Sequence, residues 1–193
     1  MNLNDKPFDN IEKISQFCNQ CLQEEYITID TEFIRTSTFF PKLCLVQIAN
    51  SKCAAIIDVL AVKNLNPLLS LLLNKNITKV FHSPKQDLEI FYNLFKKLPI
   101  NIFDTQIAAS FLGLDEQISY EKLVQRYCNS KINKNYQFSD WSKRPLNNEQ
   151  LKYALSDVTF LRKIYSKIVY QLKKRKRLDW TFIESSKYLN IAL

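Results

Sequence analysis

The sequence predicts an α/β protein in which a mixed five-stranded sheet is flanked by helices. Two apolar runs joined by a short turn follow a first strand, and farther along the chain apolar runs alternate with helical patterns. Neither an internal repeat nor a Pro/Gly linker divides the 193 residues. Because that length supports one sizeable core and is short for two, we expect residues 1–193 to form a single domain.

Five short apolar runs are the expected strands. They are residues 26–30, 42–50, 52–60, 78–82 and 100–104. Each has the length and apolar content typical of a buried strand. Asn50 and Ser51 form a turn between the second and third runs, which predicts an antiparallel hairpin.

Segments with helical periodicity separate and follow these strands. They are residues 11–23, 65–74, 84–97, 105–113, 119–129 and 147–177. Asn66 is the expected cap of the second helix, with Pro67 at its first position, and Pro84 opens the third. Gly113, the chain's only glycine, is expected to stop the fourth helix. The last segment is so long that we expect more than one helix within it.

Composition is that of a soluble globular protein, with 46% hydrophobic and 24% charged residues. The apolar runs LCLV and LLSLLL fall far short of the ~20 residues that span a bilayer, and the first residues do not resemble a signal peptide. Five cysteines favour reduced thiols in a cytoplasm. Cys18 and Cys21 have zinc-knuckle spacing, but without a second pair nearby we favour packing on a helix face.

The formal net charge of +8 has two explanations. A coding bias can inflate the lysine content without any partner. Alternatively, excess lysine and arginine attract an anionic partner such as nucleic acid. Charge alone does not separate these explanations, and the acidic residues described next favour nucleic acid.

Four carboxylates and a tyrosine carry the functional prediction. Asp30 and Glu32 are two apart in a strand, so both side chains leave by the same face. Tyr153 and Asp157 are four apart in a helical pattern, so they lie one turn apart. Asp87 stands near the start of another helix. Because adjacent anions repel, such a cluster favours divalent metal ions, and oxygen ligands select Mg²⁺ or Mn²⁺.

A two-metal phosphoryl-transfer site gives each residue a role. Asp30 is the natural bridge between the ions, Glu32 and Asp157 complete one of them, and Asp87 holds the second directly or through water. The Tyr153 hydroxyl orients the attacking water, and its ordinary pKa near 10 makes it a poor base at neutral pH.

Each signal also has an ordinary structural explanation. An Asp-x-Glu after a strand is commonly a solvated turn, and Asp87 near a helix start is commonly a partner of the helix dipole. Tyr153 and Asp157 at helical spacing are commonly a half-buried ring beside a surface charge. Taken singly these patterns are weak, and their order along one chain is what strengthens them.

The chain resembles the ribonuclease D family, DEDD exonucleases with a tyrosine in their third motif. The first motif corresponds to IDTEFIR…FFPKLCLVQIA, the second to KVFHSPKQDLEIF and the third to LKYALSDVTFLRKIY. FDTQIAASFLG and SDWSKRPLNNEQLKYA also follow the family, from about residue 8 to LDWTFIE near the end. None of the expected carboxylates is replaced.

The resemblance implies a ribonuclease-H-like sheet, two divalent metal ions and 3′-to-5′ hydrolysis of RNA to nucleoside 5′-monophosphates. It also implies trimming of RNA 3′ ends, including those of tRNA precursors. The family usually carries further helical domains that grip RNA, and this sequence stops after the catalytic domain, which puts tRNA processing in doubt. Compact relatives clear short RNA fragments, and some form homo-oligomers. The alternatives are a DNA 3′–5′ exonuclease and an inactive RNA-binding module of the same fold.

For several further residues the sequence allows both a structural and a functional role. His82 is favoured as a structural residue over a metal ligand, because Mg²⁺ prefers oxygen. Asp104 either caps the following helix, which we favour, or supports the metal site. Lys173 to Arg177 (KKRKR) is either a solvated helix end or an RNA-backbone contact. Phe138 and Trp141 either stack on an unpaired base or, as we favour, anchor the polar loop of residues 131–147.

Overall fold

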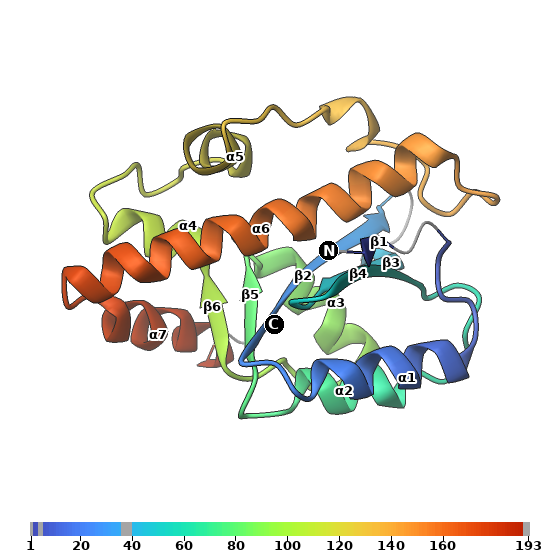
Figure 1. Ribbon diagram of the computed structural model, residues 1–193. Helices are drawn as coiled ribbons and strands as arrows, with labels where there is room; N and C mark the ends of the chain where they lie inside the picture. Colours follow the sequence, from blue (N-terminus) through green and yellow to red (C-terminus); the bar gives the residue numbers. More distant parts are fainter. Residues whose placement is uncertain (1, 4–5, 36–39, 191–193) are drawn as a thin grey trace.

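A mixed β-sheet with helices on both faces forms the body of the protein in the computed structural model (Figure 1). The structure describes residues 2–3, 6–35 and 40–190, so Phe39 of the first motif lies outside the described residues. The strands are β1 (Asn2–Leu3), β2 (Tyr26–Ile34), β3 (Lys42–Ala49), β4 (Cys53–Asp58), β5 (Thr78–Phe81) and β6 (Ile102–Asp104). Their order across the sheet is β1-β4-β3-β2-β5-β6.

The five expected strands are confirmed, and the structure adds a sixth. The hairpin of β3 and β4 is antiparallel, as predicted, and the Asn50 side-chain oxygen accepts hydrogen bonds from the backbone N–H groups of Lys52 and Cys53 in its turn. β2 pairs with β3 in antiparallel fashion and with β5 in parallel, which makes the sheet mixed. The expected count of five missed β1, because two residues carry no detectable period.

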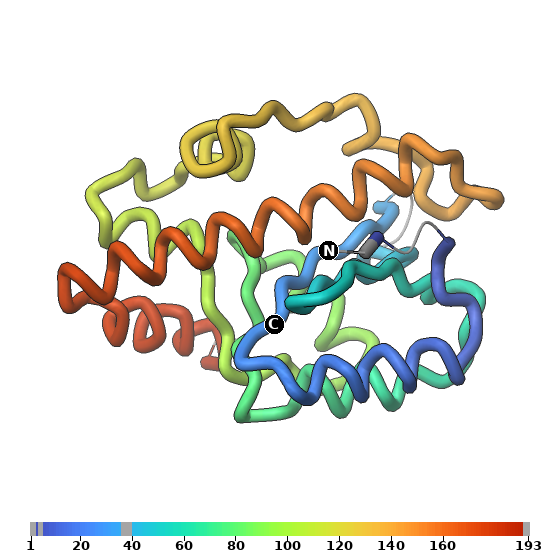
Figure 2. Tube along the Cα trace, in the orientation of Figure 1, coloured from blue at the N-terminus to red at the C-terminus, as the bar shows by residue number. Residues whose placement is uncertain are grey.

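The helices are α1 (Ile11–Cys21), α2 (Asn66–Leu72), α3 (Lys85–Phe95), α4 (Thr105–Ser110), α5 (Tyr120–Cys128), α6 (Asn148–Lys174) and α7 (Leu178–Ser186), with short 3-10 turns η1 (Lys134–Tyr136) and η2 (Lys187–Asn190). Helices α1, α2 and α3 cover one face of the sheet, and α6 crosses the other (Figure 1). The segment between α5 and α6 runs beside α6 toward its first turn (Figure 2). A buried core lies on each side of the sheet.

Residues 148–174 form one continuous helix, so the expectation that this segment divides into several helices was wrong. The helix opens on a capping box, in which Asn147 and Gln150 satisfy each other's backbone N–H groups. No glycine or proline interrupts its buried apolar stripe, which continues from Leu151 to Leu172. The chain turns only at Lys176, which has a φ of 55°, and α7 follows.

Helix ends were predicted with mixed success. Asp104 and Ser119 accept hydrogen bonds from the first turns of α4 and α5, and Gly113 takes a φ of +85° after α4. The cap assigned to Asn66 was wrong: Asn66 is the first helical residue, and its N–H donates to the Asn64 side chain instead.

The positions of the cysteines and the composition of the helices bear on the zinc site and the membrane span that the sequence argued against. Cys18 and Cys21 are buried in the core on the inner face of α1, as the packing explanation requires, and all five cysteines are unpaired. Within the described part of the chain, none of the helices combines the length and the apolar composition needed to cross a membrane.

Candidate active site

Three carboxylates converge between the sheet and α6. Asp30 and Glu32 occupy alternate positions of β2, and Asp157 comes from the facing side of α6. One oxygen of each lies within 4.8 Å of the others. Glu32 and Asp157 are buried, whereas Asp30 keeps part of its surface exposed. An all-oxygen group of this kind could hold a hard divalent cation such as Mg²⁺ or Mn²⁺.

Hydrogen bonds fix the turn of α6 that carries Asp157. The Thr28 hydroxyl donates to the backbone carbonyl of Val158 over 2.8 Å, which ties β2 to the helix. The Tyr120 hydroxyl donates to the backbone carbonyl of Asp157 from α5. Because one bond comes from the sheet and the other from a helix, the turn of α6 that carries Asp157 is held from two sides.

Asp87 stands beside this group rather than within it. It lies in the first turn of α3, a helix that packs on the opposite face of the sheet, and it lines the same cavity as Asp30 and Glu32. Thr31, which alternates with Asp30 and Glu32 along β2, donates its hydroxyl proton to Asp87 Oδ1 over 2.5 Å. The charge of Asp87 still contributes to the raised pKa values of Asp30 and Glu32, so it belongs to the same electrostatic unit.

Burial raises the pKa of all four carboxyl groups. Desolvation is the main cause for each. It raises the pKa of Asp157 to about 7, although the Tyr153 side chain counteracts part of this effect, and that of Asp87 to about 6. The pKa of Asp30 lies well above its ordinary value because the charges of Asp157 and Asp87 add to desolvation. Such a site favours either protonation or a bound cation.

Tyr153 completes the constellation one helical turn before Asp157. Burial, followed by the nearby charge of Asp157, raises the pKa of its hydroxyl above the ordinary value. The hydroxyl therefore keeps its proton at neutral pH and can orient a polar group. It is not suited to act as a base.

Trp141 supports Tyr153 from the polar loop. The residue is only 1% exposed, and its ring stacks on that of Tyr153, with centroids 6.0 Å apart and planes inclined by 28°. Phe138, in the same loop, is 92% exposed. The two aromatic residues thus have different roles. Trp141 anchors the loop, as favoured from the sequence, whereas Phe138 is exposed and could contact a ligand.

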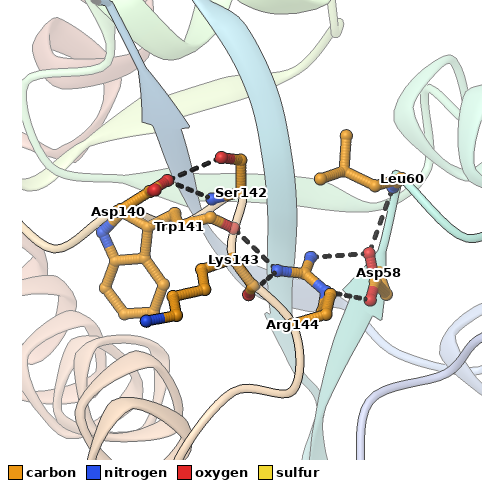
Figure 3. Close-up of polar contacts among 7 residues, drawn as sticks. All are labelled: Asp58, Leu60, Asp140, Trp141, Ser142, Lys143 and Arg144. Atoms are coloured by element: carbon orange, nitrogen blue, oxygen red, sulfur yellow. Dashed lines mark hydrogen bonds and ion pairs between the residues drawn. The ribbon is translucent and has the colours of Figure 1, made fainter.

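An ion pair binds this loop to the end of strand β4 (Figure 3). The Arg144 guanidinium donates to both carboxylate oxygens of Asp58, over 2.6 and 2.7 Å, at the end of β4. It also donates to the backbone carbonyls of Trp141 and Lys143. Because the ion pair is bidentate and the guanidinium also bonds the loop backbone, it fixes the position of the loop relative to β4.

The acidic residues line a groove with two compartments. One cavity of about 240 Å³ extends toward α5, and a second of about 700 Å³ extends between β2, the first turn of α3 and the polar loop. Asp30, His82, Gln137 and Tyr153 line both. Phe138 lines the larger cavity. The carboxylates therefore lie at the junction of the two compartments, where an extended ligand could occupy both.

His82 and Asp104 make well-defined structural contacts. The Thr105 hydroxyl donates to the Phe81 carbonyl, and His82 Nδ1 lies within hydrogen-bond distance of the same hydroxyl, at 3.0 Å. Burial lowers the pKa of His82 to about 4, and the ring is neutral at neutral pH. Asp104 caps α4 through the N–H of Gln106, as favoured from the sequence.

The basic run from Lys173 to Arg177 is only partly solvated. Arg175 and Arg177 donate to the backbone carbonyls of Leu112 and Phe111, which brace the end of α6 against the end of α4. Lys173, Lys174 and Lys176 are exposed. The run is therefore more than the solvated helix end considered from the sequence, and contact with RNA stays a prediction.

Comparisons with known proteins match most of the chain, including all the residues of the candidate active site. A family model described as 3′–5′ exonuclease matches residues 6–173. A ribonuclease D of Bartonella henselae is 46% identical over 157 residues, which cover 81% of this chain and 39% of the relative. The chain thus spans less than half the length of this curated relative.

Solved structures of related proteins have the same fold. Escherichia coli RNase D superimposes with a TM-score of 0.93 at 31% identity, covering 98% of this chain and 50% of that one. Brucella melitensis NrnC with bound Mg²⁺ superimposes with a TM-score of 0.77 at 25% identity, covering 88% of this chain and 84% of that one. These matches confirm the resemblance drawn from the sequence motifs and the expected ribonuclease-H-like α/β fold.

Proposed function

The chain belongs to the 3′–5′ exonuclease family, and from that membership we propose that residues 1–193 act as one metal-dependent 3′-to-5′ exoribonuclease domain that releases nucleoside 5′-monophosphates. The observation that carries the proposal is the convergence of Asp30, Glu32 and Asp157 along the groove formed by the two compartments. Many nucleases hydrolyse phosphodiesters with two cations at the scissile phosphate, and this is the place in the described structure where carboxylates gather to hold such ions.

The residues present fit divalent ions. All the donors are oxygens, and Asp157 Oδ1 is buried with no hydrogen-bond partner among the described residues. We assign Asp30, Glu32 and Asp157 to one ion, and Asp87 together with Asp30 to a second. When bound, the ions supply an activated water and stabilise charge on the scissile phosphate. Mg²⁺ and Mn²⁺ are the proposed cofactors.

The remaining residues position the substrate and the water. The protonated Tyr153 hydroxyl orients the attacking water. His82 is neutral and lines both compartments, so it shapes the groove without adding a charge. Phe138 is exposed at the wall of the larger compartment, where it can stack on an unpaired base.

RNA with a free 3′ end is the proposed substrate. Escherichia coli RNase D is described as an exoribonuclease involved in structured RNA processing, which supports trimming of RNA 3′ ends, including those of tRNA precursors. Clearance of short RNA fragments uses the same chemistry and is the second proposed role. The unpaired cysteines support the proposal of a cytoplasmic location.

The test is an oligonucleotide assay with matched sugars. A 5′-labelled single-stranded RNA and the DNA of the same sequence are incubated with protein and Mn²⁺ or Mg²⁺, and in parallel with EDTA. We expect a ladder that shortens from the 3′ end of RNA only with metal. Shortening of DNA alone would instead support a DNA exonuclease, and binding without any shortening would support an inactive RNA-binding module.

A further inference from the structure

Gln47 lies directly opposite Asp30 in the pairing of β2 with β3. Residues directly opposite each other project from the same face of a sheet, with Cβ atoms about 4.5–5.5 Å apart. That face is the one covered by α6, because Thr28, two residues before Asp30, donates to the backbone carbonyl of Val158. The Gln47 side chain therefore lies between the sheet and α6, beside the proposed bridging carboxylate.

The amide of Gln47 is an unusual group to find in this position. The residue is 0% exposed, and neither its side-chain nitrogen nor its side-chain oxygen has a hydrogen-bond partner among the residues that the structure describes. Its neighbours on the same face of β3, Leu45 and Ala49, belong to an apolar cluster with residues of α6. Because a buried unpaired amide destabilises the folded state, an apolar side chain of similar volume would suit the core better.

A functional partner explains why this position carries an amide. The strand register places Asp30 directly opposite Gln47, and the long glutamine side chain can reach its carboxylate by rotation about its own bonds. A neutral N–H donor suits a carboxylate that must bind cations, since it orients the oxygen without cancelling the negative charge. A lysine in the same place would compete with the metal for Asp30.

We propose that Gln47 is a positioning residue, whose Nε2–H donates to the Asp30 carboxylate when that carboxylate holds a divalent cation. The bond fixes the orientation of the carboxylate between the two ions. Groups that hydrogen-bond to metal ligands commonly tune affinity in this way. The inference rests on the proposed metal-dependent function, and it adds a residue that neither ligates metal nor contacts substrate.

The proposal predicts opposite effects of one substitution on two measurements. Gln47→Met keeps the volume but removes the amide. Without metal, the variant should melt roughly 2–4 °C above the wild type, because the unpaired amide has gone. Its affinity for Mn²⁺, measured by isothermal titration calorimetry, should fall about 10- to 100-fold. Gln47→Leu, which has a different shape, should repeat both changes.

Thr181→Val is the matched control. Thr181 is also 0% exposed with an unpaired side-chain oxygen among the described residues, but it lies in α7, which packs against β6 and α4. This variant should gain thermal stability and bind Mn²⁺ like the wild type. A purely structural role for Gln47 predicts that both variants behave alike.

The outcomes separate the inference from the proposed function. If Gln47→Met binds Mn²⁺ as tightly as the wild type, or melts lower without metal as expected when a bound water satisfies the amide, the role of Gln47 is refuted while the metal centre stands. If the wild type itself binds no Mn²⁺, the metal centre is refuted, and the role of Gln47 with it.

Discussion

The indole ring of Trp141 stacks on the phenol ring of Tyr153, and the loop that carries Trp141 is bound to β4 by the pair of Arg144 and Asp58. A carboxylate at the end of a strand thus supports the position of a tyrosine in the candidate active site. Neither Asp58 nor Arg144 is among the residues that line the two compartments at the carboxylates. Their effect on hydrolysis should therefore pass through the loop that they hold in place, and their effect on kcat through the ring of Tyr153.

Asp58→Asn should lower kcat for RNA hydrolysis by about 10-fold, because a loosened loop lets the Tyr153 hydroxyl move from its place. KM should rise as well, because Phe138 of the same loop lines the larger compartment. The measurement is a double-mutant cycle with Tyr153→Phe. If the anchor acts through the hydroxyl, Asp58→Asn should have almost no further effect on kcat in the Tyr153→Phe background. Equal losses in both backgrounds would show that Asp58 acts by another route.

Tyr153→Phe should slow hydrolysis without abolishing it. The variant loses a group that orients water, while the carboxylates and their ions stay in place. We expect a decrease in kcat of roughly 100-fold, at the low end of the contribution of positioned proton-handling groups. Asp157→Asn, one turn farther along α6, should in contrast fall to background. Single-turnover rates at saturating Mn²⁺ measure both, and equal losses would contradict the positioning role.

Stability without metal should depend on pH in the opposite sense to most acidic residues. The folded-state pKa values of Asp157 and Asp87, about 7 and about 6, exceed the values near 4 of unfolded chains. The folded protein thus binds more protons than the unfolded protein between about pH 4 and 7. The free energy of unfolding contributed by these groups falls as pH rises through that window. Melting temperatures in EDTA from pH 5 to 8 should decrease accordingly.

The variant Asp157→Asn tests whether this pH dependence of stability originates at the candidate active site. The amide does not titrate, so the variant should lose less stability than the wild type between pH 5 and 8 and should melt higher at pH 8. An identical pH dependence in both proteins would place its origin elsewhere. In the wild type, Mn²⁺ should stabilise more strongly at pH 8 than at pH 5, because it binds the ionised carboxylates.

Local spacing explains what the sequence could predict about the site. The two-residue separation of Asp30 and Glu32 and the four-residue separation of Tyr153 and Asp157 already place each pair on one side of its element. Their meeting depends on contact between β2 and α6, which spacing does not reveal. The family motifs supplied the link.

Long-range pairs were beyond the reach of the sequence. The bond from Thr31 to Asp87 and the pair of Asp58 with Arg144 join segments far apart along the chain. Gln47 in LCLVQIA gave no signal of its own, since its place opposite Asp30 depends on strand register. The division expected within α6 was wrong because nothing in its apolar stripe requires a break before Lys174.

The most direct test of the central claim is the activity of Asp30→Asn on 5′-labelled single-stranded RNA with Mn²⁺. The substitution keeps the size of the side chain and removes the charge that is proposed to be shared between two ions. Far-ultraviolet circular dichroism and a melting curve would show that the variant is folded. We predict no shortening of the RNA above the level seen with EDTA. A folded Asp30→Asn protein that degrades RNA at the wild-type rate would contradict the assignment of the site.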